Sequence, residues 1–206
     1  MPASRRVTLF HSPNTRSTGA VALMEELGVP YDLHVLKKGE QRGDAYMAIN
    51  PMGKVPAVVH DGALVTEQGA VYMYLADLYP EAHLAPPIGD PLRGPYLRWM
   101  VYYGSSFEPA VVDRAQKAPP APAGMCPYGD FDTMLKTLDD QLSKGPYILG
   151  DKFTAADVLW GVALAWTTNF KLVPLTPAIA AYVERINSRP AIARAKAKDA
   201  ELAAHS

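Results

Sequence analysis

Residues 50–66 read NPMGKVPAVVHDGALVT and predict how the first part of the chain folds. Two short apolar runs, residues 56–60 and 63–66, flank the dipeptide Asp61-Gly62. This dipeptide favours the two-residue turn of a β-hairpin, because both of its residues tolerate positive φ. The segment therefore predicts two antiparallel strands that are entered from a proline-containing turn.

The residues before this hairpin predict a strand, a helix and a second strand. Residues 7–10 (VTLF) and 31–36 (YDLHVL) are the strand candidates. Between them, apolar residues follow the i, i+3, i+4, i+7 spacing of an amphipathic helix: Ala20, Leu23, Met24 and Leu27. Gly28 is placed to end this helix. Because the two strands flank a helix, we expect them to be parallel.

A short helix before Asn50 and a helix through residues 71–78 complete a β-α-β-α-β-β-α order. This order predicts an α/β unit, a small mixed four-stranded sheet with helices packed on it. Prolines between residues 80 and 95 indicate a linker, and beyond it only helical spacing recurs. We therefore predict an α/β domain over residues 1–80, a linker over 81–92 and an all-helical bundle over 93–206. Residues 155–168 are apolar on nearly every face, so this helix should lie at the centre of the bundle.

The composition argues against several classes of function. Twenty basic and twenty-one acidic residues leave a formal charge of -1, so no overall field attracts nucleic acid or an anionic membrane. No apolar run has the length of a membrane span or a signal-peptide core, and the one cysteine, Cys126, cannot form an internal disulfide. The five histidines show no metal-ligand spacing, and no phosphate-binding loop or Cys-x-x-Cys motif occurs. We expect a cytoplasmic protein without a metal site.

Residues 10–17 (FHSPNTRS) carry the polar side chains between the first strand and the first helix. Hydroxyl, amide and backbone N–H groups at a helix N-terminus favour a bound anion, and a thiolate held there has a lowered pKa. A second interpretation is that these residues only cap the helix. The loop by itself leaves both interpretations open.

The turn at residues 50–58, followed at short range by Thr66-Glu67-Gln68, resembles the glutathione-site signature of cytosolic glutathione transferases. The order of segments agrees with this family over essentially the whole chain. The resemblance implies a thioredoxin-like fold for the first domain and glutathione as co-substrate. It also implies a cis peptide bond between Val55 and Pro56, which turns the Val55 backbone toward the cysteinyl part of glutathione.

The same resemblance assigns the other glutathione contacts. Glu67 and Gln68 are expected to hold the γ-glutamyl end, although the family usually has Ser at the second position. Gln41, Arg42 and Lys54 lie where the family places groups for the glycine carboxylate. For Arg42, a solvated surface charge is the alternative interpretation.

The loop offers three candidates for the residue that activates the thiol, and it contains neither Cys nor Tyr. Ser12, four residues before Arg16, resembles the serine-type classes and is our first candidate. Asn14 is the second, because Ser12-Pro13-Asn14 resembles the loop of bacterial members that reduce disulfides. Ser17 matches a third pattern. His11 is expected either to pack in the core or to line the substrate pocket.

The resemblance implies that a small hydrophobic electrophile binds against the first long helix of the second domain. The candidates are His11, Arg98, Trp99, Tyr102, Tyr103, Ser106, Phe107 and Trp166, and the alternative for the aromatic residues is that they form core. Thr154 and Asp157 have the spacing of a capping box, so we interpret Asp157 as structural rather than catalytic.

These expectations describe a glutathione transferase that acts as a homodimer. The alternatives are glutathione-dependent disulfide or peroxide reduction on the same fold, and a non-catalytic module that binds glutathione or an apolar ligand. An isomerase or a dehalogenase would share every feature named above.

Overall fold

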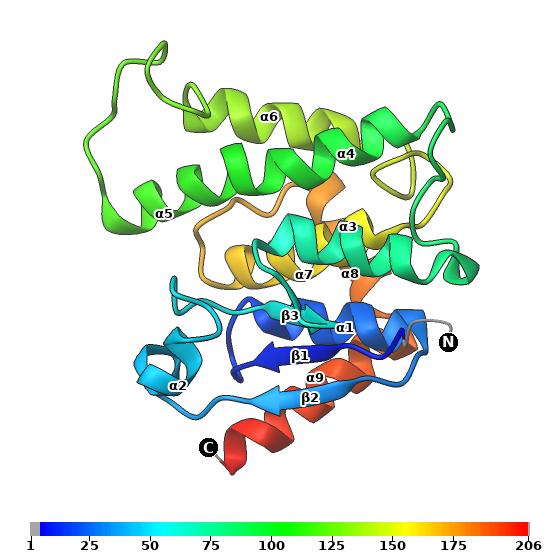
Figure 1. Ribbon diagram of the computed structural model, residues 1–206. Coiled ribbons are helices and arrows are strands. Elements are labelled where there is room, and N and C mark those ends of the chain that lie inside the picture. Colours follow the sequence, from blue (N-terminus) through cyan, green and yellow to red (C-terminus); the bar gives the residue numbers. More distant parts are fainter. Residues whose placement is uncertain (1–4, 206) are drawn as a thin grey trace. The chain divides into compact units, whose positions relative to one another are not determined.

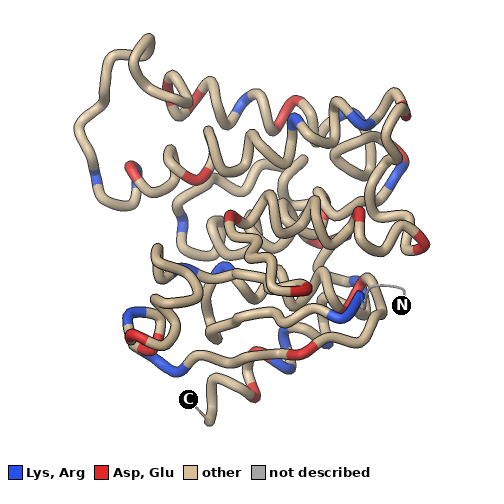
Figure 2. The backbone as a smooth tube through the Cα atoms, viewed as in Figure 1, with Lys and Arg blue, Asp and Glu red and all other residues tan. Residues whose placement is uncertain are grey.

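The computed structural model describes residues 5–205, which form two compact units (Figure 1). The first unit contains the chain up to Leu84 and again from Arg189 onward, and the second contains Ala85–Ser188. Both basic and acidic positions occur in each unit (Figure 2).

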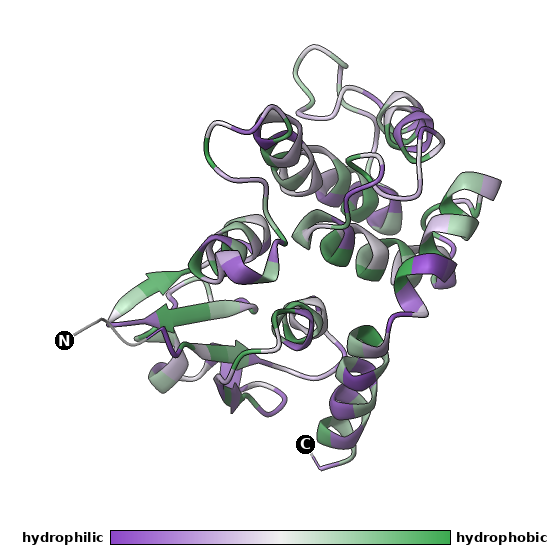
Figure 3. Ribbon diagram, turned by 90° about the vertical axis from the view of Figure 1, so that its right-hand side faces the viewer, coloured by the Kyte–Doolittle hydropathy of each residue, from purple (hydrophilic) through white to green (hydrophobic). Residues whose placement is uncertain are grey.

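The first unit is built on a four-stranded mixed sheet, as predicted. Its strands are β1 (Thr8–His11), β2 (Asp32–Val35), β3 (Ala57–His60) and β4 (Ala63–Val65), in the order β2-β1-β3-β4. β1 and β2 are parallel, whereas β3 is antiparallel to both β1 and β4. Asp61 and Gly62 have φ values of 49° and 81°, which confirms the hairpin that their sequence predicts. The strands are largely hydrophobic (Figure 3).

Four α-helices belong to this unit: α1 (Ser17–Leu27), α2 (Asp44–Met47), α3 (Gln68–Leu78) and α9 (Pro190–Ala204). Short 3₁₀ turns at Glu40–Arg42 and Pro80–Ala82 precede α2 and follow α3. The predicted stop of α1 is confirmed, because Gly28 has a φ of 66° and donates its N–H to the carbonyl of Met24. Glycine adopts this left-handed conformation without the steric cost of a Cβ atom.

The position of α9 corrects the predicted domain boundary, which assigned residues 93–206 to one helical bundle. α9 packs on α1 and belongs to the first unit. Ile192 and Ala195 are fully buried, and Arg189 makes a two-bond ion pair with Glu26 at 2.6 and 2.8 Å. Helical spacing shows that residues 190–204 have an apolar face but not which helix covers it, so the sequence did not identify the partner. The alternation of polar and apolar residues on this helix is visible in Figure 3.

The second unit is all-helical, as predicted. It contains α4 (Arg93–Tyr102), a π-helical turn at Tyr103–Phe107, α5 (Glu108–Gln116), α6 (Phe131–Leu142), α7 (Ala155–Asn169) and α8 (Pro177–Asn187). α7 is buried on nearly every face, which confirms it as the central helix. Gly161 of α7 faces Ile186 of α8, and the close approach of the two helices leaves no room for a side chain at this glycine.

The predicted capping box begins α7. Asp157 is fully buried and its carboxylate accepts hydrogen bonds from the backbone N–H groups of Thr154 and Ile148, each at 2.8 Å, and from the hydroxyl of Tyr182 at 2.8 Å. Burial raises the pKa of Asp157, and these hydrogen bonds oppose the rise. The carboxylate joins the start of α7 to α8 and to the loop that contains Ile148, so its role is structural.

Candidate functional site

Three segments that the sequence singled out meet at one edge of the sheet. Phe10 pairs with Ala57, so the loop after β1 lies beside the turn that precedes β3. Val58 pairs with Val65, so the residues between β4 and α3 lie at the same edge. The antiparallel register therefore brings together residues 12–16, 50–56 and 66–68.

The turn before β3 is held by its own polar groups. The carbonyl of Lys54 accepts hydrogen bonds from the Tyr46 hydroxyl at 2.6 Å and from the Asn50 amide at 2.9 Å. Gly53 has a φ of 57°, and a Cβ atom there would lie 2.6 Å from the carbonyl oxygen of Gln41. The peptide bond between Val55 and Pro56 is cis, as the resemblance implied.

The start of α3 forms the second side of the site. Glu67 is exposed and has a φ of 60°, which is unusual for a residue with a Cβ atom. It immediately precedes Gln68, the first residue of α3, whose side-chain amide donates to the carbonyl of Arg16 at 3.3 Å. This bond connects the start of α3 to the loop after β1.

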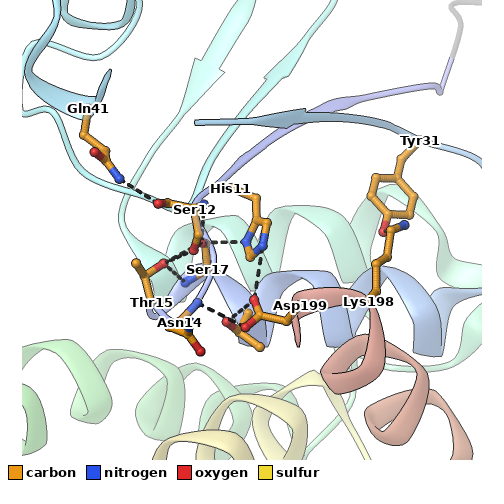
Figure 4. A network of polar contacts seen from close by, with 10 residues as sticks. His11, Ser12, Asn14, Thr15, Ser17, Tyr31, Gln41, Lys198 and Asp199 are labelled. Atoms are coloured by element: carbon orange, nitrogen blue, oxygen red, sulfur yellow. Dashed lines mark hydrogen bonds and ion pairs between the residues drawn. The ribbon is translucent and has the colours of Figure 1, made fainter. Parts of the chain in front are cut away.

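Ser12 lies at the end of β1 and is largely buried, with 5% of its surface exposed. Its Oγ accepts a hydrogen bond of 2.7 Å from the side-chain amide of Gln41 (Figure 4). Because Gln41 donates this bond, the single hydroxyl proton of Ser12 is available for a different acceptor. The assignment of Gln41 to a glycine carboxylate stays a prediction, because the bond to Ser12 uses only one of the two N–H groups of its amide.

Arg42 and Lys54 are both exposed. The Arg42 guanidinium donates to the carbonyl of Met52 at 3.3 Å, which keeps it beside the turn before β3. Their assignment to a glycine carboxylate therefore stays a prediction.

Ser17 is enclosed and does not reach the surface of the loop. Its hydroxyl lies 2.8 Å from Nδ1 of His11 and 2.7 Å from the hydroxyl of Thr15, and it accepts the N–H of Ser12 at 3.1 Å. Both Ser17 and His11 have no exposed surface. These contacts correct two expectations: Ser17 cannot approach a bound thiol, and His11 does not line a substrate pocket.

Asp199 of α9 is the functional candidate that the sequence did not reveal. Its carboxylate accepts the N–H of Asn14 at 3.0 Å and the Thr18 hydroxyl at 2.7 Å, and Oδ1 lies 3.1 Å from Nε2 of His11 (Figure 4). Burial alone would raise the pKa of Asp199, but the hydrogen bonds from His11, Thr18 and the Asn14 N–H lower it below the usual value. The sequence did offer one signal for this role: Asp199 has the helical spacing that places it on the same face as the apolar residues Ile192 and Ala195.

Asn14 adopts a left-handed conformation with a φ of 56°, and its side chain is exposed. Its backbone N–H is already bound to Asp199. The side-chain amide is therefore the only part of Asn14 that could act on a ligand through a donated hydrogen bond.

The aromatic candidates of the second unit form a cluster around Trp160, which is fully buried. The rings of Tyr103 and Phe107 lie 5.5 and 5.0 Å from the Trp160 ring, and their side chains are 2% and 0% exposed. The structure thus corrects the pocket assignment of these two residues, because both are core residues. Trp99 also belongs to the cluster.

The remaining pocket candidates stay predictions. Tyr102 is half-buried and donates its hydroxyl to the carbonyl of Met134 at 3.0 Å. Trp166 packs edge-on against Phe170 at 6.1 Å, Ser106 is buried, and Arg98 lies over the Trp99 ring.

Two further properties concern residues 5–205. Within this range, no three His, Cys, Asp or Glu side chains are grouped so that they could hold a metal ion. Among the helices of the same residues, none has the length and apolar character needed to cross a membrane.

In the first unit, a cis-proline turn of the mixed sheet lies beside a polar loop and a helix N-terminus, and a helical unit follows in the chain. These features define the class of thioredoxin-like glutathione-binding proteins. Comparison with known proteins gives the family. The model of the glutathione S-transferase N-terminal domain matches residues 5–77, and that of the C-terminal domain matches residues 128–185. Together these matches cover more than half of the chain, which belongs to the glutathione S-transferase family.

Individual relatives agree with this assignment. Glutathione S-transferase GstA of Escherichia coli O157:H7 is 29% identical over 189 residues, covering 89% of this chain and 94% of the relative. A glutathione transferase structure from Methylococcus capsulatus is 28% identical with a TM-score of 0.80, covering 95% of this chain and 99% of its own. A sphingomonad glutathione S-transferase complexed with glutathione is 29% identical with a TM-score of 0.79, covering 94% of this chain and 98% of its own. The disulfide-bond oxidoreductase YfcG of Escherichia coli K12 is 26% identical over 208 residues, covering 93% of this chain and 95% of the relative.

Proposed function

We propose that this protein is a glutathione transferase in which the hydroxyl of Ser12 donates a hydrogen bond to the sulfur of glutathione. The observation that carries this assignment is the bond from the Gln41 amide to Ser12 Oγ. It fixes the hydroxyl oxygen as an acceptor, so the proton of Ser12 remains for the sulfur. The thiolate then attacks the electrophile, a carbon–sulfur bond forms, and the leaving group departs with the displaced electron pair.

The energy that this role requires is modest. A free thiol has a pKa of about 8.5, and lowering it by about two units takes roughly 2.7 kcal/mol. A hydrogen bond to a charged acceptor contributes about 1.5–3 kcal/mol. The N-terminus of α1 adds little, because the N–H groups of its first residues, Ser17, Thr18 and Gly19, already donate to Thr15 and Arg16. Most of the stabilisation of the thiolate is therefore assigned to Ser12.

The other parts of glutathione match the groups at the same sheet edge. The backbone of Val55, beside the cis bond, suits the cysteinyl backbone. Glu67 suits the ammonium of the γ-glutamyl group, and Gln68 with the first N–H groups of α3 suits its carboxylate. Arg42 and Lys54, both exposed near the turn, are the candidates for the glycine carboxylate.

A second candidate function is glutathione-dependent disulfide reduction, which the exposed side chain of Asn14 favours. In that reaction the glutathione thiolate would attack a mixed disulfide and expel the second thiolate, so one disulfide is exchanged for another. The two functions differ in which side chain faces the sulfur, and a pair of substitutions separates them.

The test compares Ser12→Ala and Asn14→Ala with the wild type and with Ser143→Ala. The control removes an exposed hydroxyl that only bonds the Asp139 carbonyl at the end of α6. Turnover is measured with a chlorodinitrobenzene-type electrophile and with a glutathione mixed disulfide, and the pKa of the bound thiol is followed by the ultraviolet absorbance of the thiolate.

We expect Ser12→Ala to raise the pKa of the bound thiol by about one to two units and to lower kcat/KM for conjugation by about 10–100-fold below that pKa. Asn14→Ala and the control should leave both values near those of the wild type. If Asn14→Ala instead abolishes disulfide reduction while conjugation is absent in the wild type, the reductase takes the place of the transferase. If the wild type does not bind immobilised glutathione, both enzyme functions are excluded, and a non-catalytic module that binds an apolar ligand remains.

Membership of the family supports the finer parts of the proposal. We propose that the second substrate is a small hydrophobic electrophile, that the reaction serves detoxification, and that the protein works as a homodimer in the cytoplasm. Light scattering coupled to size exclusion tests the dimer: a mass of one chain across the concentration range would contradict it.

A further inference from the structure

The carboxylate of Asp199 is connected to Ser12 by a path of polar contacts, in which Asp199 and His11 lie within ion-pair distance and the later links are hydrogen bonds. Oδ1 lies 3.1 Å from Nε2 of His11, and Nδ1 of the same ring lies 2.8 Å from Ser17 Oγ. Ser17 Oγ in turn accepts the backbone N–H of Ser12 at 3.1 Å. Figure 4 shows that this path runs from α9, through the end of β1, to the loop before α1.

The hydrogens on this path can be assigned from the charge of Asp199. The carboxylate can only accept, so the His11 proton belongs on Nε2, and Nδ1 is left as an acceptor. Ser17 then donates its single hydroxyl proton to Nδ1 and keeps its lone pairs for the N–H of Ser12. The opposite tautomer would direct a lone pair of Nε2 at the carboxylate 3.1 Å away, so the two like partial charges would repel each other.

The rest of the loop agrees with this assignment. The Thr15 hydroxyl lies 2.7 Å from both the carbonyl of Ser12 and Ser17 Oγ, and its single proton serves these two acceptors, so the proton of Ser17 remains for His11. The N–H and the carbonyl of Ser12 are thus both held by hydroxyl groups of the same loop, and Gln41 holds its side chain. The direction of the Ser12 hydroxyl therefore depends on a network whose one fixed charge is Asp199.

An aspartate–histidine–serine path is also the arrangement of a hydrolase triad, but this one cannot act as such. Ser17 has no exposed surface, so no substrate carbonyl can approach its oxygen. The hydroxyl at the end of the path that a ligand could reach is that of Ser12, which the path contacts through its backbone N–H.

We propose that Asp199, on α9, is a positioning residue that acts through His11 and Ser17 to orient Ser12 toward the sulfur of glutathione. This inference rests on the proposed function. It makes α9 part of the thiol-activating machinery. Other bonds hold α9 on α1 without contacting the loop, such as the bond from Arg194 to Glu25 at 2.9 Å.

The test is Asp199→Asn, which keeps the shape of the side chain and removes its charge. The matched control is Arg194→Met, which removes a different bond between α9 and α1. Two readouts are used: the pKa of bound glutathione, from thiolate absorbance, and the nitrogen chemical shifts of the His11 ring, which report its tautomer. Ser17→Ala, a small change that breaks the path at its other end, is the second variant should Asp199→Asn fold poorly.

If Asp199 positions Ser12, Asp199→Asn raises the pKa of the bound thiol by about 0.5–1 unit, which lowers the thiolate fraction about three- to tenfold below that pKa. The His11 proton also leaves Nε2. Ser17→Ala gives a rise of similar size, and the double variant gives no more than the larger single change, because both break one path. Arg194→Met leaves the pKa and the tautomer unchanged.

Three results would overturn the inference, and they differ from one another. A thiol pKa that falls in Asp199→Asn would mean that the carboxylate acts only as a like charge near the thiolate. An unchanged pKa with a lower melting temperature would mean that Asp199 only holds α9 in place. A wild type that forms no bound thiolate would overturn the proposed function and this inference together.

Discussion

Gly161 gives a sharp test of how closely α7 and α8 pack. In the substitution Gly161→Ala, the new Cβ atom would lie 2.3 Å from Cγ2 and 2.6 Å from Cβ of Ile186. Carbon atoms in contact are normally about 3.5–4.0 Å apart, so the two positions must separate by more than about 1 Å. Ile186 is fully buried, and its Cβ atom is fixed to the α8 backbone, so a change of rotamer cannot relieve the clash.

Two opposing terms set the size of the effect. Alanine is favoured over glycine in a helix interior by about 1 kcal/mol. Overpacking of a core costs typically about 1–3 kcal/mol and occasionally more, and a contact this short between two helices belongs at the upper end. We therefore expect Gly161→Ala to lower the free energy of unfolding by about 2 kcal/mol.

The assay is urea unfolding of Gly161→Ala beside Gly94→Ala. Gly94, near the start of α4, has open space where its Cβ atom would lie, so this control changes only helix propensity and should leave stability equal or raise it by up to about 1 kcal/mol. Adding Ile186→Ala should not rescue Gly161→Ala, because the Cβ atom of residue 186 remains. Equal stability of Gly161→Ala and the wild type, or rescue by Ile186→Ala, would refute this account of the α7–α8 contact.

Three further changes test other contacts. Asp157→Ala leaves three buried donors unpaired, the N–H groups of Ile148 and Thr154 and the Tyr182 hydroxyl. At about 1–3 kcal/mol for each unpaired donor, it should cost about 3 kcal/mol or more in urea unfolding, whereas a loss below about 1 kcal/mol would contradict the role of this carboxylate. Folding lowers the pKa of Asp199, so the stability that its carboxylate contributes is present above the unfolded pKa of about 3.9 and is lost as the pH falls through the folded pKa. The difference in free energy of unfolding between the wild type and Asp199→Asn should therefore shrink in acid. A difference that grows in acid would contradict the lowered pKa. Arg189→Met leaves Glu26 nearly buried without its two-bond partner, and hydrogen exchange should show faster exchange of the α9 amides with the α7 amides unchanged.

Local patterns predicted most of the secondary structure, because each of those elements is set by residues close together in the chain. The Asp61-Gly62 turn, the stop of α1 at Gly28 and the capping box at Thr154 depend on backbone conformations that few residue types favour. The buried faces of α7 likewise follow from its own apolar residues.

What the sequence did not show depends on contacts between distant residues. The bond that the Asn14 N–H donates to Asp199 joins residues 185 positions apart, and no local spacing encodes such a pair. The packing of α9 on α1 was missed for the same reason. The aromatic residues of the second unit illustrate the same limit, since helical spacing places Tyr103 and Phe107 on one face without showing that Trp160 covers them. For Gln41, a polar side chain near the site was identified, but its acceptor was not.

The return of the chain from the second unit to α9 has a consequence for biosynthesis. The sheet unit is interrupted by residues 85–188, so its first 84 residues leave the ribosome long before the helix that covers α1. At roughly 5–20 residues per second, translation of the interrupting segment takes roughly 5 to 20 seconds. During this interval the nascent sheet unit exposes the α1 surface that Ile192 and Ala195 later bury, and Glu26 lacks its arginine partner. The helical unit, which is continuous in sequence, can fold first, and the appearance of α9 then completes the unit that was begun earlier.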